Sequence, residues 1–151
     1  MDKSYPLHEG ARSALRITGV LCCLLVIGIP LGIWLFVRAG KARVALTDEG
    51  LSATNAFAST AFAWRDVARL GLLKIAIVTG GGMGGALARQ RVGGDEATHV
   101  VVRLADGKLR SFMVSAYENM AEIVDVVERR TGKPCEALTP GALGVGSAKW
   151  P

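Results

Sequence analysis

The chain is poor in the residues that build most catalytic and metal sites. Its 151 residues include only three cysteines and two histidines, His8 and His99, and aromatic residues make up 6% of the sequence. No cysteine pair suggests a disulfide framework, and no histidine or cysteine stands at zinc-ligand spacing. Near His99, only Asp95 and Glu96 offer carboxylates. We therefore predict no catalytic, cofactor-binding or metal-binding residues, and we expect the protein not to be an enzyme.

A strong excess of one charge is also absent. The chain has 18 Lys and Arg against 13 Asp and Glu, a net charge of +5, and the two signs are interspersed. Such mixing is typical of a solvated surface, although it is compatible with weak attraction to anionic lipid head groups. No basic run alternates with aromatics, and no helix-turn-helix or zinc spacing occurs. We therefore predict no nucleic-acid partner.

Charge is missing altogether from one stretch of the chain. Residues 17–37 read ITGVLCCLLVIGIPLGIWLFV, a run of 21 residues without a charged side chain. At about 1.5 Å of rise per residue, a helix of this length crosses a hydrocarbon core of about 30 Å. Gly28 and Pro30 weaken a helix in water but are tolerated in membrane spans. The sequence predicts a single transmembrane helix over 17–37, preceded by an N-terminal tail over 1–16.

The residues on either side of this run indicate whether it is cleaved and which way it is oriented in the membrane. A cleaved signal peptide is the weaker explanation, because its apolar run is usually about 7–15 residues long and follows a short start. Three basic residues lie on each side: Lys3, Arg12 and Arg16 before the run, and Arg38, Lys41 and Arg43 after it. The cluster after the run is denser, which favours the cytoplasm for the C-terminal side. We expect a single-pass protein of the inner cell membrane with a cytoplasmic C-terminal domain.

Strand patterns fill much of the chain after the apolar run. The β-compatible stretches are 42–47, 51–54, 57–63, 70–78, 98–104 and 109–114. The last two are joined through Asp106 and Gly107, the favoured residue pair for a tight hairpin turn. This part of the sequence therefore predicts a set of short antiparallel strands that includes one well-marked β-hairpin.

One amphipathic helix is predicted after these strands, over 116–131. Ser115 and Glu118 have the spacing of a capping box, and apolar residues recur on one helical face. Gly132 can supply a left-handed cap at the C-terminal end. A helix with one apolar stripe must cover something, and the sheet is the natural target. Residues 133–151, rich in Gly, Ala and Pro, are predicted to form a flexible tail.

Three short motifs stand in order along this domain: VALTDEGL at 44–51, AWRDV at 63–67 and LADGK at 104–108. Together with the closing helix they resemble a bacterial PH-like (pleckstrin-homology-like) domain over 42–132. The resemblance implies a mainly-β (α+β) fold whose antiparallel sheets form a partly open barrel closed by a C-terminal helix. The Gly-rich loop over 79–97 departs from the family pattern. Fold alone implies no activity.

The Gly-rich loop raises one chemical alternative. Gly80, Gly82 and Gly85 satisfy G-x-G-x-x-G after an apparent strand, the pattern that cradles a dinucleotide pyrophosphate. The context opposes it, because one hairpin and one helix follow instead of alternating strands and helices. No Gly-Lys-Ser/Thr of a P-loop occurs. Arg89 and Arg91 at the end of the loop are placed to touch lipid phosphates or a partner, although solvated charges are the simpler interpretation.

A few further residues are candidates for sites. Cys135, with Lys133 nearby, is either a modestly reactive thiol or an inert tail cysteine. Trp64 is most simply a packing residue at a strand junction. Asp66 beside Arg65 and Arg69 indicates a local surface ion pair. None of these residues carries a catalytic assignment.

The sequence therefore predicts a membrane-anchored, non-catalytic binding or assembly module that presents a PH-like domain at the membrane surface. Its expected partners are the lipid bilayer and a membrane or membrane-proximal protein, and no cofactor is expected. Two alternatives stay open. The first is a small membrane-tethered nucleotide-binding enzyme that uses the Gly80-Gly85 loop, and the second is an accessory subunit of a larger membrane complex.

Overall fold

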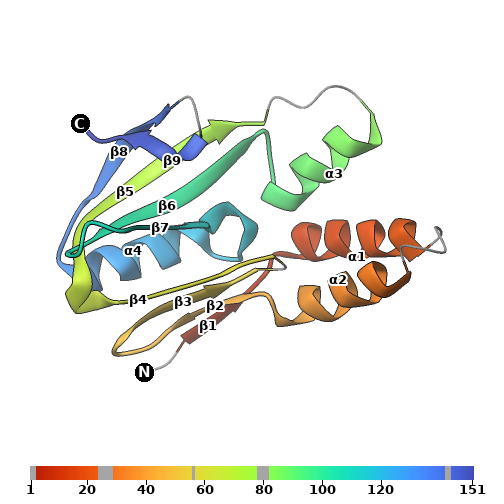
Figure 1. The fold of residues 1–151 in the computed structure, drawn as a ribbon, viewed down its shortest axis with the longest axis horizontal. Coiled ribbons are helices and arrows are strands. Elements are labelled where there is room, and N and C mark those ends of the chain that lie inside the picture. The colour runs from red at the N-terminus through yellow and green to blue at the C-terminus, as the bar shows by residue number, and fades with distance from the viewer. Residues whose placement is uncertain (1–2, 24–28, 56, 78–81, 142–143) are drawn as a thin grey trace.

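A computed structural model describes residues 3–23, 29–55, 57–77, 82–141 and 144–151, and these form an α+β fold (Figure 1). The strands are β1 (Lys3–Pro6), β2 (Arg43–Leu46), β3 (Gly50–Thr54), β4 (Ser59–Ala63), β5 (Val67–Ala76), β6 (Glu96–Leu104), β7 (Leu109–Met113), β8 (Cys135–Gly141) and β9 (Gly144–Lys149). The α-helices are α1 (Glu9–Cys23), α2 (Ile29–Lys41), α3 (Met83–Val92) and α4 (Met120–Thr131). Two 3-10 turns, η2 (Trp64–Asp66) and η3 (Val114–Ala116), complete the described elements.

The strands form two sheets that curl into a half-barrel. One sheet has the order β1-β2-β3-β4, and the other has the order β7-β6-β5-β8-β9. Neighbouring strands are antiparallel except for β5 and β8, which run parallel. The sheets adjoin at β4 and β7, where the Thr60 hydroxyl donates to the Ser111 carbonyl at 3.2 Å. At the other side, β1 leads into a bridge between Leu7 and Tyr117, so the two sheets enclose one space.

The main core fills this enclosed space. Helix α4 lies across it (Figure 1), and its Ile123 and Val127 are fully buried. Trp64 is also buried, and its indole N–H donates to the Thr47 carbonyl at 3.0 Å, so it is the packing residue that the sequence predicts. A smaller apolar cluster lies on the outer face of the second sheet, where β8 and β9 cover Leu73 and Val101.

The predicted transmembrane helix is wrong. Residues 17–37 do not form one helix, because α1 ends at Cys23 and α2 begins at Ile29, while 24–28 lie outside the described residues. Among the described residues, no helix is both long enough and apolar enough to cross a membrane. The single-pass localisation in the inner membrane, with a cytoplasmic C-terminal domain, is therefore not supported.

The two helices pack side by side instead, and they project from the sheets (Figure 1). Small residues make this close approach possible, since a Cβ added at Gly19 would lie 3.3 Å from the Gly32 carbonyl oxygen. Pro30 stands in the first turn of α2, where its missing N–H has no partner to lose. Composition alone does not separate one long span from two short packed helices, and this explains the wrong prediction.

The other elements match the sequence in part. The β6–β7 hairpin is confirmed, and Gly107 has a φ of 81° in its turn. Helix α4 ends at Thr131 and is capped by Gly132 with a left-handed φ of 66°, as predicted, but it begins at Met120 with Asn119 as N-cap. The capping box does not form because the Ser115 hydroxyl accepts the Thr98 N–H at 3.1 Å instead.

Three segments that were expected to lack regular structure contain it. Strand β1 lies within the expected N-terminal tail over 1–16, and it pairs with β2. Helix α3 occupies part of the Gly-rich loop over 79–97. Strands β8 and β9 lie in the expected tail over 133–151. Strand β8 pairs with β5 and with β9. In each case pairing or packing against a distant segment outweighs weak local preference.

Candidate functional site

A set of large apolar side chains is exposed on α1 and α2. Each is between 40% and 58% exposed, and together we call them the hairpin surface: Ile17, Val20, Ile29, Leu31, Ile33, Trp34, Phe36 and Val37. Single exposed apolar residues are common on proteins, but large exposed patches mark binding surfaces. The hairpin surface is therefore the strongest candidate site in the described part of the chain.

The buried faces of the two helices consist mainly of small residues, with Leu15 and Leu35 as the large exceptions. The buried positions are Ala11, Ala14, Leu15 and Gly19 on α1, and Gly32, Leu35 and Ala39 on α2. Gly19 and Gly32 let the two helix backbones come close together where they meet. Ala11, Leu15 and Ala39 also belong to the main core, so the base of the helix pair is fixed to the sheets.

Arginines stack on aromatic rings around the hairpin surface. The Arg16 guanidinium lies 5.9 Å from the Phe36 ring centre. A longer series joins three segments, and we call it the ladder: Arg38 lies 5.1 Å from the Trp34 ring centre, Trp34 lies 6.1 Å from Phe57, and Arg91 lies 5.4 Å from Phe57. Such contacts hold a cation close to apolar surface without neutralising its charge.

Arg91 occupies an unusual place in the ladder. It is half-buried beside a small cavity of about 20 Å³ that is also lined by Asn55 and Tyr117. Burial raises the pKa of Tyr117 to about 12, so this ring is neutral, and its hydroxyl donates to the Thr54 carbonyl at 3.0 Å. Burial also lowers the pKa of Arg91. Within the described ranges no ion pair includes Arg91, so its charge is not compensated by a carboxylate.

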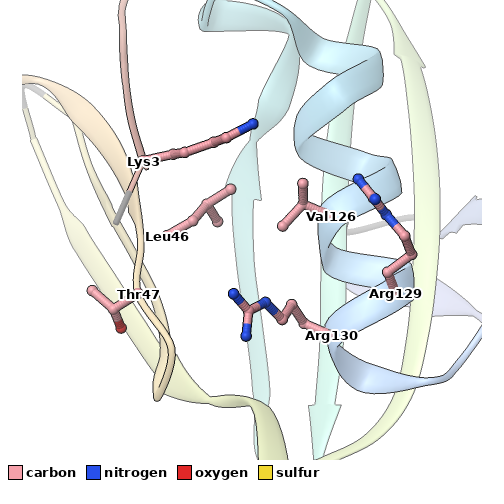
Figure 2. Close-up of a pocket in the computed structure, with 6 residues that line it drawn as sticks. All are labelled: Lys3, Leu46, Thr47, Val126, Arg129 and Arg130. Carbon is pink, nitrogen blue, oxygen red and sulfur yellow. The ribbon is translucent and has the colours of Figure 1, made fainter. Parts of the chain in front are cut away.

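A second basic cluster differs because its charges are already paired. Figure 2 shows a pocket of about 240 Å³ between β2 and α4, lined by Lys3, Leu46, Thr47, Val126, Arg129 and Arg130. Its ion pairs are Lys3–Glu122 at 2.8 Å, Arg129–Asp125 at 2.6 Å and Arg130–Asp48 at 2.8 Å. Hydrogen bonds from Arg130 and Lys3 lower the pKa of Asp48 and of Glu122, respectively. An anion entering this pocket would have to displace these carboxylates.

The proposed nucleotide loop is described only in part. Gly80 lies outside the described residues, Gly82 caps α3 with a φ of 106°, and Gly85 is buried within α3. Strand β6 after this helix runs antiparallel to β5. Dinucleotide folds need the next strand to be parallel, so the described geometry gives that alternative no support.

The two histidines have different surroundings. His8 is the residue before α1, and its Nδ1 accepts the Ala11 N–H at 3.0 Å. His99 lies on β6, where burial lowers its pKa. Asp95 forms an ion pair with Arg89 at 3.2 Å. In the described part of the chain, no three His, Cys, Asp or Glu residues are placed to hold a metal ion.

Cys135 has the environment of an unreactive thiol. Burial, reinforced by the nearby Glu128 carboxylate, raises the pKa of Cys135 to about 12. A thiol with this pKa stays protonated at neutral pH. Because the thiolate is the reactive form, we expect Cys135 to be unreactive. Asp66 lies 3.7 Å from Arg65, as predicted, whereas Arg69 forms its ion pair with Glu136 instead.

No family model, curated protein or solved structure matches this chain. The resemblance to PH-like domains therefore stays a prediction. Sequence reasoning missed the hairpin surface because the apolar run suggested one span. It missed the ladder because Phe57 and Arg91 are far from α2 in the sequence. A partial signal existed, since Trp34 and Arg38 are four residues apart on one helix and so lie on the same face.

Proposed function

We propose that this protein is a non-catalytic binding module that docks on an anionic lipid surface through the hairpin surface of α1 and α2. The observation that carries the proposal is the gathering of large, exposed apolar side chains on one projecting helix pair. Of the twelve large apolar side chains that are exposed in the described residues, eight lie on these two helices, and the others are Phe57, Met83, Leu109 and Met120. Docking would not require either helix to cross the bilayer.

The size of the hairpin surface suits shallow insertion. The apolar part of α2, from Ile29 to Val37, is about 13 Å long at 1.5 Å per residue. Helices that lie in the bilayer interface bury their apolar face about 5–10 Å deep. Fully burying a large apolar side chain contributes about 1.5–3 kcal/mol, so each half-exposed residue here can add roughly 1 kcal/mol. Several such residues acting together give measurable binding.

The charges around the hairpin favour lipid over a second copy of the chain. Helices α1 and α2 carry Arg12, Arg16, Arg38 and Lys41 against one acidic residue, Glu9. Two copies meeting through this surface would bring like charges together. Anionic head groups offer the opposite charge, and each nearby Lys or Arg adds about 1 kcal/mol of attraction. Trp34 beside Arg38 also fits the head-group level, where Trp is enriched.

Vesicle flotation with the full chain tests the proposal. The probe is phosphatidylcholine vesicles containing phosphatidylglycerol, and the variant is Ile33→Asp, which places a charge where the wild-type side chain is 58% exposed. We expect wild type to float with the vesicles and Ile33→Asp to bind about tenfold more weakly or worse, because a carboxylate resists transfer into hydrocarbon. The matched control is Leu109→Asp, at an apolar residue of β7 that is 37% exposed, and it should bind like wild type.

Two results would contradict lipid docking. The first is wild type that stays with unbound protein at every vesicle concentration. The second is a vesicle-independent dimer, seen by sedimentation, that Ile33→Asp separates into monomers, because it would make a second copy the occupant of this surface. Thermal unfolding of each variant shows that a loss of binding is not a loss of fold.

A further inference from the structure

We infer that Arg38 and Arg91, at the two ends of the ladder, bind phosphate groups of anionic lipids once the hairpin surface has docked. The inference rests on the proposed docking function and adds to it a specific head-group site. It assigns a role to Phe57 and Trp34 as well, because these rings hold the two guanidinium groups beside the apolar surface.

The first support is the lack of any other counter-charge. In the described ranges, neither Arg38 nor Arg91 takes part in an ion pair, whereas Arg69, Arg129 and Arg130 each bind a carboxylate. A half-buried cation without a partner is unfavourable, because burial removes part of its hydration. Arg91 is in this position, with neutral Tyr117 and the Phe57 ring beside it. An incoming anion would remove this unfavourable state.

The second support is the position of the ladder relative to the apolar side chains. Trp34 is part of the hairpin surface, and Phe57, which is 59% exposed, extends it from the connection between β3 and β4. Arg91 adds a cation from the last turn of α3. Three segments thus place two guanidinium groups next to apolar rings, which matches a lipid interface where phosphates lie beside hydrocarbon.

The third support is chemical fit. A guanidinium offers a planar fork of N–H donors that binds two phosphate oxygens at once. Its weak hydration and its ability to stack on rings let it work at an apolar boundary. A lysine ammonium would bind phosphate as a point charge without this fork. The paired cluster in Figure 2 lacks these conditions, because its cations are already bonded to Glu122, Asp125 and Asp48.

The experiment compares binding of the full chain to two kinds of vesicle, pure phosphatidylcholine and phosphatidylcholine with phosphatidylglycerol. The variants are Arg91→Gln and Arg38→Gln. The matched control is Arg65→Gln, which removes the same charge from a side chain that is 89% exposed. Arg65 belongs to η2, and the connection between β4 and β5 lies at the end of the sheets away from α1 and α2 (Figure 1).

We expect Arg91→Gln and Arg38→Gln each to lower binding to the phosphatidylglycerol vesicles about fivefold or more. Arg65→Gln should lower it much less, and none of the three should change binding to pure phosphatidylcholine. Arg91→Lys should keep only part of the wild-type preference, because it retains the charge and loses the fork. Arg38→Gln keeps the test decisive if Arg91→Gln does not fold, since Arg38 lies on the last turn of α2.

Equal losses for Arg91→Gln, Arg38→Gln and Arg65→Gln would overturn the inference, because they would show only diffuse attraction of a basic protein. Equal binding of wild type to both kinds of vesicle would also overturn it. Either result leaves hydrophobic docking intact provided that Ile33→Asp still reduces binding. Wild type that binds neither vesicle would instead contradict the proposed function itself, so the two failures are distinguishable.

Discussion

The two sheets with α4 and the α1–α2 hairpin use similar apolar residues in opposite ways. In the sheets, large side chains such as Leu51, Leu70 and Val102 face inward and are essentially inaccessible. In the hairpin, the buried side consists mainly of small residues, with only Leu15 and Leu35 as large ones, and eight large apolar side chains are exposed. Both regions contribute to one core at the hairpin base, so the reversal happens along the helices and not at a domain boundary.

The difference shows that the number of apolar residues in a segment does not decide whether their side chains are buried. A sheet places alternate residues on one face, so a strand with period-two apolar residues fills the core. A helix pair packed closely at Gly19 and Gly32 has little space inside, and of its larger described residues it buries Leu15 and Leu35. The exposed large residues need a partner other than the protein's own core, and this is the basis of the proposed docking.

Thiol reactivity should show the largest difference between the regions. In a background with Cys22 and Cys23 replaced by serine, we expect Cys135 to react with iodoacetamide at pH 8 about 1,000-fold more slowly than a cysteine introduced by Ile33→Cys, because its pKa is raised to about 12. The raised pKa means that the Cys135 rate should keep rising between pH 9 and 11, where the rate at position 33 levels off. Similar rates would show that Cys135 is not shielded.

Truncation of a core residue should produce the next largest effect. Ile123→Ala removes a fully buried side chain of α4, and we expect it to lower the free energy of unfolding by about 2–5 kcal/mol. Ile33→Ala removes the same group from the hairpin surface and should change the free energy of unfolding by about 0.5 kcal/mol or less. Urea unfolding followed by circular dichroism measures both. A large loss for Ile33→Ala would contradict the exposure of the hairpin surface.

The glycine contact between α1 and α2 should have an intermediate effect. Gly19→Val places a side chain against the Gly32 carbonyl oxygen, and we expect the helices to move apart at a cost of about 1–3 kcal/mol. The control is Gly40→Val, where an added Cβ has no described atom within 4 Å, and the change should be about 0.5 kcal/mol or less. If Gly19→Val and Gly40→Val unfold at the same urea concentration, α1 and α2 do not pack closely at Gly19.

The smallest expected effect concerns the junction between the two regions. His8→Ala removes the side-chain acceptor for the Ala11 N–H at the start of α1, and we expect a loss of about 1 kcal/mol. His8→Asn supplies another acceptor and should recover much of this loss. The same urea measurement applies to both variants, and equal stability of the alanine and asparagine variants would exclude a capping role.

The sheet portion of the fold was largely predictable from sequence. Local signals were strong there: alternating residues defined β6, a glycine with positive φ closed the turn before β7, and Gly132 ended α4. Where the local signals competed with distant partners, the prediction was wrong. Ser115 matched a capping box, but its hydroxyl accepts a hydrogen bond from the Thr98 N–H of β6 instead. Strand β8 gave little signal because it depends on pairing with β5.

The candidate site was much less predictable. The apolar run is uninterrupted by charge, so hydropathy could not show that it is divided between two helices. Gly19 and Gly32 are the residues that make the division workable, yet single glycines also occur in membrane spans. The ladder depends on contacts of Phe57 and Arg91 with α2 or its neighbours, and no local pattern encodes contacts between segments so far apart.

Strand β1 pairs with β2, and the whole hairpin lies between them in the chain. Joining two strands across a long flexible segment carries an entropy penalty from loop closure. Helices α1 and α2 reduce this penalty when they fold back on each other, because the start of α1 and the end of α2 then lie next to the paired residues Pro6 and Arg43. The N-terminal strand should therefore join its sheet only after the helix pair has formed, which makes β1 a late element in folding.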